Sequence, residues 1–219
     1  MAASTPESGK KPSPSPVLLC ACSGAGWIEE EKLSALHSAL TADGREVEFV
    51  PDLCRIAAQD PERLRDKCSA GNEPTIVACY PRAVHGLLAR AGVAEPETSV
   101  HVIDLRTGTA AAALEALSTA PAENQRDPDL PVDDSADDWT PWYPVIDPER
   151  CVDCKQCMNF CLFGVYGEDE EGHIAVTHPD ACKTNCPACA RICPEAAIMF
   201  PKYPHEPING AEVGELSSE

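Results

Sequence analysis

The sequence predicts an α/β protein in two parts: a larger N-terminal domain with a parallel sheet and a smaller α+β domain near the C-terminus. In the first part, short apolar runs of strand length alternate with amphipathic stretches of helix length. Strands that alternate with helices form parallel sheets covered on both faces. In the second part, eight of the thirteen cysteines fall into two closely spaced runs, which indicates a small unit built around metal.

The N-terminal domain is expected over residues 16–118, after a disordered tail at 1–15 that is rich in proline, serine and lysine. The predicted strands cover residues 17–22, 46–50, 75–79 and 100–104. Helices are predicted at residues 27–42, in a short segment that begins at Pro61, and at residues 110–117. A further helix is predicted around Val84, Leu87, Leu88 and Ala91, which have helical spacing. An acidic, proline-rich linker at 119–143 follows, and residues 205–219 form a polar tail.

The two cysteine runs have spacings that suit iron–sulfur cubes. The first run, C-x2-C-x2-C-x3-C, consists of Cys151, Cys154, Cys157 and Cys161. The second run, C-x3-C-x2-C-x3-C, consists of Cys182, Cys186, Cys189 and Cys193. A 4Fe–4S cube needs four converging thiolates, and in the bacterial two-cluster pattern the fourth cysteine of each run binds the other cube.

The spacing therefore predicts two crossed 4Fe–4S clusters. Cluster I is expected to be held by Cys151, Cys154, Cys157 and Cys193, and cluster II by Cys182, Cys186, Cys189 and Cys161. Zinc is the alternative. It fits poorly, because zinc prefers separated pairs of cysteines that close a single tetrahedral site.

Residues 144–204 resemble a bacterial-type two-cluster ferredoxin domain. Besides the cysteine spacings, the segment 145–151 parallels the segment 176–182, so that strand, cluster loop, short helix and strand occur twice. The resemblance implies a ferredoxin-like α+β fold and a function in electron transfer. The sequence departs from the family pattern at Leu162, where the family has proline, and by one extra residue between Cys182 and Cys186.

Four of the five other cysteines lie at or just beyond the ends of predicted strands, namely Cys20, Cys22, Cys54 and Cys79. Open α/β sheets bind ligands beyond the carboxyl ends of their strands, so these four thiols are candidate ligands of a third iron–sulfur cluster. Burial as small apolar side chains is the alternative, and it is our interpretation of Cys68.

Short motifs in residues 16–105 resemble the N-terminal domain of the heterodisulfide reductase A-subunit family. These motifs are the start at Cys20–Gly24, the single Cys54, and the run Val77–Arg82. The resemblance implies an additional iron–sulfur cluster at the four cysteines. Tyr80 stands where serine is usual, and the flavin-binding domain of that family has no counterpart in the sequence.

The formal net charge of −19 argues against nucleic acid as a partner, because binding to phosphate needs a basic surface. An acidic surface instead favours redox partner proteins with basic docking patches. No segment reaches the length of an export signal or of a membrane span, which predicts a cytoplasmic protein whose cysteines bind metal.

Electron transfer is the predicted function, either as a carrier or as a redox subunit of an oxidoreductase, and no catalytic residue is recognisable. Two alternatives stay open: a ferredoxin-fed oxidoreductase with a small-molecule or thiol site at the sheet edge, and a structural or sensing iron–sulfur protein. Trp139, Trp142 and Tyr143 are expected to dock the linker onto the ferredoxin-like unit, with a partner contact as the alternative.

Overall fold

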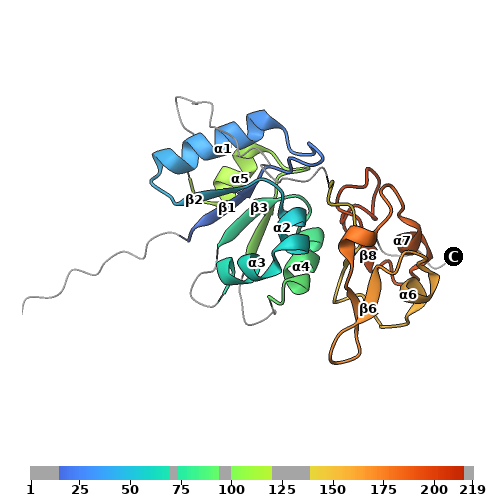
Figure 1. Ribbon diagram of the computed structural model, residues 1–219. Helices are drawn as coiled ribbons and strands as arrows, with labels where there is room; N and C mark the ends of the chain where they lie inside the picture. Colours follow the sequence, from blue (N-terminus) through green and yellow to red (C-terminus); the bar gives the residue numbers. More distant parts are fainter. Residues whose placement is uncertain (1–14, 70–73, 94–99, 120–138, 215–219) are drawn as a thin grey trace, which may run out of the picture.

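A computed structural model describes residues 15–69, 74–93, 100–119 and 139–214 (Figure 1). We name residues 15–119 the sheet region and residues 139–214 the cysteine-loop region. Residues 1–14, 70–73, 94–99, 120–138 and 215–219 lie outside the described residues, and they include most of the predicted linker and the end of the predicted C-terminal tail. The predicted domain boundaries therefore stay predictions.

Among the described residues of the sheet region, four parallel strands pair in the order β2-β1-β3-β4. The strands are β1 (Val17–Cys20), β2 (Val47–Val50), β3 (Thr75–Ala78) and β4 (His101–Asp104). All four residues of β1 are buried, as is typical of a central strand in a parallel sheet covered on both faces. The predicted mixed α/β fold with a parallel sheet is confirmed.

Helices cover both faces of this sheet, with α1 and α5 on one face and α2, α3 and α4 on the other (Figure 1). Their bounds are α1 (Glu30–Ala42), α2 (Leu53–Gln59), α3 (Pro61–Lys67), α4 (Pro81–Arg90) and α5 (Ala110–Ala116). Successive side chains of β1 point to opposite faces, so Cys20 joins the core under α2 and α4 while Leu19 joins the core under α1 and α5.

Helix α2 was not predicted, although it carries one of the candidate ligands. Asp52 caps its first turn, because the carboxylate accepts a hydrogen bond of 3.3 Å from the backbone N–H of Arg55. Leu53 and Cys54 are buried in that turn. The helix therefore fixes Cys54 immediately beyond the end of β2.

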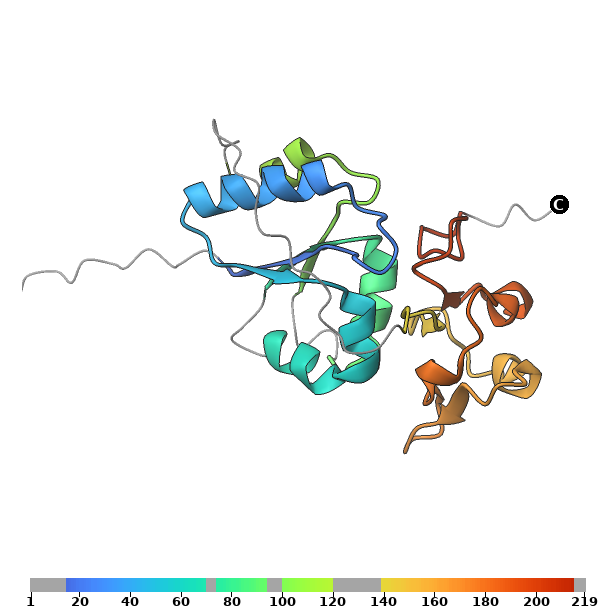
Figure 2. The same cartoon turned by 45° about the horizontal axis from the view of Figure 1, so that its top comes forward.

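The cysteine-loop region shows the predicted repeat of strand, helix and strand. The first half contains β5 (Val145–Ile146), α6 (Gln156–Phe160) and β6 (Tyr166–Glu168). The second half contains β7 (Ile174–Val176), a 3-10 turn at Pro179–Ala181, α7 (Ala188–Ile192) and β8 (Ile198–Met199). Strand β5 pairs with β8 and β6 with β7, both antiparallel, and the two short helices lie side by side (Figure 2). The first strand of the repeat thus pairs with the last, and the two middle strands pair with each other. This pairing relates the two halves by a pseudo-twofold axis.

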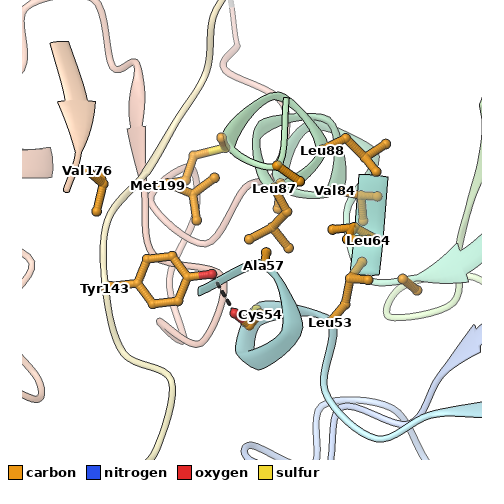
Figure 3. Close-up of a cluster of buried hydrophobic side chains, with 14 of the residues drawn as sticks. Leu53, Cys54, Ala57, Leu64, Val84, Leu87, Leu88, Tyr143, Val176 and Met199 are labelled. Carbon is orange, nitrogen blue, oxygen red and sulfur yellow. Dashed lines mark hydrogen bonds between the residues drawn. The ribbon is translucent and has the colours of Figure 1, made fainter. Parts of the chain in front are cut away.

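One apolar core runs from the sheet region into the cysteine-loop region (Figure 3). Helix α4 packs against β5, and Gly86 makes this approach possible, because a Cβ atom there would lie 2.6 Å from Val145 Cγ1 and 2.9 Å from the carbonyl of Ile146. The Tyr143 hydroxyl donates a hydrogen bond of 2.6 Å to the carbonyl of Cys54. The two regions are therefore packed against each other.

The predicted aromatic docking segment contacts both regions. Trp142 packs against Phe200, as expected, with ring centroids 5.4 Å apart. Tyr143 instead reaches α2 of the sheet region, and the carbonyl of Trp139 accepts a hydrogen bond from Arg55. The segment therefore joins the two regions rather than covering the cysteine-loop region alone.

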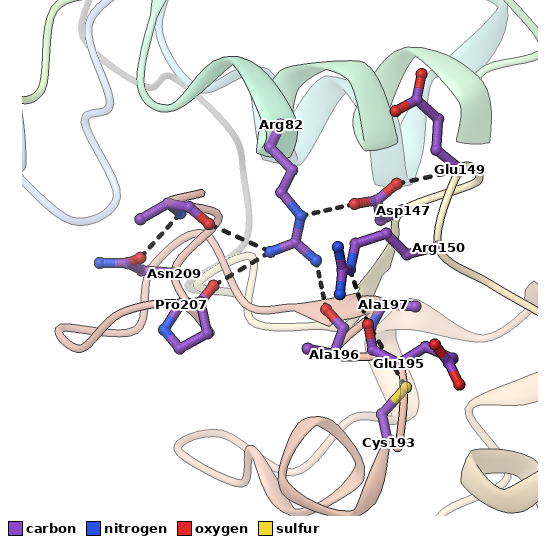
Figure 4. Close-up of polar contacts among 11 residues, drawn as sticks. Arg82, Asp147, Glu149, Arg150, Cys193, Glu195, Ala196, Ala197, Pro207 and Asn209 are labelled. Carbon is purple, nitrogen blue, oxygen red and sulfur yellow. Dashed lines mark hydrogen bonds and ion pairs between the residues drawn. The ribbon is translucent and has the colours of Figure 1, made fainter. Parts of the chain in front are cut away.

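Arg82 of α4 forms the main polar contact between the regions (Figure 4). Its Nε lies 2.6 Å from Asp147 Oδ2, and both side chains are buried. Its other nitrogens donate to the carbonyls of Ala196, Pro207 and Ala211. The described part of the predicted tail is thus bound to α4.

No helix in the described ranges combines the length and the apolar character that a bilayer span requires.

Candidate iron–sulfur sites

The first cysteine run lies on a loop that joins β5 to α6. Asp153 and Lys155 adopt positive φ angles of 51° and 61°, which wind the backbone tightly between the cysteines. The side chains of Cys151, Cys154 and Cys157 line one small cavity inside this loop. Local backbone geometry therefore brings three thiols to one point.

Cys193 lines the same cavity, although it lies at the end of α7 in the second half of the repeat. Its charge acts on the thiols of Cys151 and Cys157, and its sulfur accepts a hydrogen bond of 3.3 Å from the N–H of Ala197. The structure thus places Cys193 with the first run.

The second group is arranged in the same crossed way. The thiol of Cys182 feels the charges of Cys189, Cys186 and Cys161, in that order. Cys161 belongs to the first run and ends α6, so it reaches across to the loop of the other half. The extra residue in this loop is accommodated by Asn185 at a φ of 63°.

Burial controls the protonation of these thiols. It raises the pKa of Cys157 and of Cys189 to about 11, and that of Cys182 to about 12. Iron binds the thiolate form, so a bound cluster would displace these protons. Two groups of four converging thiols fit the donor set that a 4Fe–4S cube requires.

Tyr166 lies between the two groups and was not singled out from the sequence. It is buried, and its hydroxyl points at the thiol of Cys189, while the charges of Cys157 and Cys161 also act on it. Burial, followed by the charge of Cys189, raises the pKa of this hydroxyl far above its ordinary value. Tyr166 is therefore neutral, and its buried hydroxyl lies beside the second group without a hydrogen bond to any described residue.

The four candidate ligands of the sheet region lie at the carboxyl ends of the strands. Cys20 ends β1, Cys54 lies in the first turn of α2, and Cys79 directly follows β3. Cys22 takes a φ of 52°, a conformation that is strained for a residue with a side chain. The charges of Cys22 and Cys79 act on both Cys20 and Cys54, so the structure brings the four thiols together.

Cys20, Cys22 and Cys54 are buried, and Cys79 is partly buried. Burial raises the pKa of Cys79 to about 12, and it raises those of the other three as well. The N–H of Leu53 donates a hydrogen bond of 3.4 Å to the sulfur of Cys20. Four thiols at one edge, three of them buried, with a backbone donor fit an iron–sulfur cluster. Cys68 is buried separately at the end of α3, as expected.

Charged side chains from distant parts of the chain surround the four thiols, and sequence reasoning missed them. Lys202 of the cysteine-loop region pairs with Asp52, which lies 150 positions away in the sequence, at 2.5 Å. Arg106 lies between the rings of Trp27 and Tyr80 and donates to the carbonyls of Pro201 and Tyr203. No local pattern marks these residues, because only the docking of the two regions brings them together.

Comparison with known proteins agrees with the crossed cysteine geometry. A family model described as a 4Fe-4S dicluster domain matches residues 143–194. Ferredoxin-3 of Nostoc sp. is 33% identical over 88 residues, which cover 32% of this chain and 84% of the relative. The chain belongs to the ferredoxin-type 4Fe-4S family.

Two further relatives of this ferredoxin-type protein come from Methanocaldococcus jannaschii. A ferredoxin is 48% identical over 61 residues, 27% of this chain, and the match spans only 41% of that relative. The pyruvate synthase subunit PorD is 40% identical over 60 residues, 27% of this chain and 67% of the relative.

The predicted ferredoxin resemblance is therefore confirmed, and an iron–sulfur role in electron transfer is supported. The likeness of residues 16–105 to the heterodisulfide reductase A-subunit family stays a prediction, since the family model covers residues 143–194 alone. The ligand sets and the third cluster likewise stay predictions.

Proposed function

We propose that this ferredoxin-type protein passes single electrons through two 4Fe–4S clusters. Cluster I would be held by Cys151, Cys154, Cys157 and Cys193, and cluster II by Cys182, Cys186, Cys189 and Cys161. The crossed arrangement carries the proposal, since Cys193 lies in the cavity of the first loop and Cys161 beside the second.

The protein would contribute thiolate ligands, a partly dry environment and hydrogen bonds to sulfur, while a bound cluster supplies one-electron redox chemistry. The N–H of Ala197 donates to the sulfur of Cys193 at 3.3 Å, and the buried hydroxyl of Tyr166 would be free to donate to the sulfur of Cys189 once a cluster is bound. Such donors favour the more negative, reduced state.

A role as a redox subunit is supported by the likeness to PorD subunits of pyruvate synthase from two methanogens. We propose that the partners are redox proteins with basic docking patches, drawn by the net charge of −19, in the cytoplasm. Cys154 is exposed on its loop, so a partner can approach cluster I closely.

We further propose that Cys20, Cys22, Cys54 and Cys79 hold a third iron–sulfur cluster, which would make the sheet region an additional electron relay. The edge that carries these cysteines is buried, and Tyr143 and Lys202 of the cysteine-loop region cover it. This cover favours a relay over a small-molecule or thiol substrate site at the same edge.

The test is to purify the whole chain without oxygen, count iron and sulfide, and follow a redox titration by electron paramagnetic resonance. Two cubes require about eight iron atoms, and a third cluster raises the count to as many as about twelve. The whole chain is needed because residues 139–203 complete the sheet-region site.

Serine variants separate the two claims. Replacing Cys20 and Cys54 together should remove the extra iron and leave about eight atoms, whereas unchanged iron would end the third-cluster proposal. Two reducible clusters that pass electrons to an added acceptor support a carrier. Clusters that hold iron but undergo no reversible reduction would favour the structural or sensing alternative.

A further inference from the structure

A buried lysine closes the four-cysteine site of the sheet region, and it comes from the other region. Lys202 follows β8, yet its side chain is only 4% exposed, and its Nζ lies 2.5 Å from an oxygen of Asp52, which is 1% exposed. Burying a charged pair is costly unless the charges are well compensated. The position of this pair therefore calls for an explanation.

The carboxylate of Asp52 is held by the sheet region itself. It accepts hydrogen bonds from the backbone N–H groups of Arg55 and Gly24, at 3.3 and 3.2 Å. A Cβ atom on Gly24 would lie 2.6 Å from Asp52 Oδ2 and 3.1 Å from Lys202 Nζ. The turn that carries Cys22 is thus closed directly over the ion pair.

The positive charge of Lys202 acts on the thiols beneath it. Burial raises the pKa of Cys22 and of Cys54, and Lys202 is the largest influence that opposes burial at both thiols. The negative charge of Asp52 acts on the same two thiols in the opposite direction. The Lys202–Asp52 ion pair therefore places one positive and one negative charge next to the four-cysteine site.

Arg106 adds a second cation from another side. Its guanidinium lies 4.4 Å from the ring centre of Trp27 and 5.0 Å from that of Tyr80, and its charge acts on Cys22 and Cys79. It donates to the carbonyls on both sides of Lys202, at Pro201 and Tyr203. Arg106 thereby holds the segment that delivers Lys202.

We propose that Lys202 compensates negative charge at the four-cysteine site and so raises the reduction potential of the cluster bound there. This inference rests on the proposed third cluster. Reduction adds one electron to a group that already carries four thiolates, and a buried cation favours the more negative product. The redox site of the sheet region is then complete only with the cysteine-loop region docked on it.

The test uses the whole chain with its clusters, titrated with dithionite as electron donor and followed by electron paramagnetic resonance. We call the paramagnetic signal of the cluster at the four sheet-region cysteines the third signal. Lys202→Met should lower the midpoint potential of the third signal, and Asp52→Asn should raise it. We expect each shift to be about a tenfold change in the reduction equilibrium constant, which is ~59 mV for one electron. The double variant should return close to the parent value.

Opposite shifts separate a charge effect from a structural one. Either single variant breaks the same ion pair, so a purely structural role would shift both potentials in one direction. Lys67→Met is the matched control. Lys67 lies on α3, pairs with Glu48 of β2, and its charge acts on the thiol of Cys68 instead. It removes the same charge and should leave the third signal in place.

Each other outcome is decisive. An unshifted third signal in Lys202→Met overturns the inference while leaving the third cluster intact. A parent protein without a third signal overturns the cluster proposal and this inference with it. If Lys202→Met loses the third cluster's iron, the double variant decides, because restored iron supports charge compensation and unrestored iron overturns it.

Discussion

The two sets of cysteines in this protein are held by different means. In the cysteine-loop region, eight thiols lie on two short loops and their adjoining helices, and Cys154 is exposed. In the sheet region, four thiols come from three separate segments and meet at one edge beneath Lys202. The first arrangement needs local backbone winding and the pairing of two adjacent halves, whereas the second needs a sheet and a covering region.

This difference gives the two kinds of site different electrostatic surroundings. The loops belong to a chain with a formal net charge of −19, and negative charge disfavours the reduced state of a nearby cluster. The buried site holds cations that act on its thiols, Lys202 and Arg106. The proposed clusters at the two kinds of site would therefore have distinct potentials.

The largest expected effect is loss of a loop cluster. Cys193→Ser should remove cluster I with about four iron atoms and destabilise the cysteine-loop region, because cluster binding supplies folding energy there. Iron analysis and electron paramagnetic resonance measure this loss. Cys68→Ser is the matched control and should keep all its iron, since Cys68 is buried away from both sets; full iron in Cys193→Ser would contradict the crossed assignment.

The second-largest expected effect is a loss of stability when the ion pair between the two regions is broken. Arg82→Met leaves the carboxylate of Asp147 buried without its ion-pair partner, so the free energy of unfolding should fall by about 3–5 kcal/mol. Denaturant unfolding measures this change. Arg82→Met combined with Asp147→Asn should recover part of the loss, and equal stability of the single variant and the parent would show that the pair is dispensable.

Packing between the two regions should have a smaller effect. Gly86→Val places a side chain within 3 Å of Val145 and Ile146, and overpacking of this kind costs about 1–3 kcal/mol. We expect the sheet-region site to lose iron before the loop clusters do, because it depends on the docked region. Gly214→Ala, with open space around it, should change nothing. If the loop clusters lost iron first, the sheet-region site would not be the one that depends more on docking of the two regions.

The smallest expected effect concerns Tyr166. Tyr166→Phe removes the buried hydroxyl beside Cys189. If that hydroxyl donates to the ligand sulfur of a bound cluster, the midpoint potential of cluster II should fall by up to ~59 mV, a tenfold change in the reduction equilibrium constant. Redox-titrated spectroscopy measures the shift. Tyr80→Phe, whose hydroxyl bonds Glu206 instead, should leave cluster II unchanged. A rise in potential would argue that the hydroxyl does not donate to the ligand sulfur.

Much of this architecture is readable from local sequence. Cysteine spacing predicts three candidate ligands of each loop because they are separated by only a few residues, whose backbone conformation is decided locally. The fourth of each group, Cys193 or Cys161, comes from the other half and follows from the two-cluster pattern. Apolar periodicity predicts the strands and most helices of the sheet region. Helix α2 was missed because its start is marked only by the cap at Asp52, whereas the equally short α3 begins at Pro61.

What the sequence by itself determined is the set of candidate ligands: their type, their spacing, and the sheet edge at which four of them lie. Only the tertiary structure decided their surroundings. The pairs Lys202–Asp52 and Arg82–Asp147 join residues 150 and 65 positions apart, and each forms only because an apolar core docks one region against the other. Contacts of this range leave no local pattern, since their energy depends on burial and on the distance between charges in the folded chain.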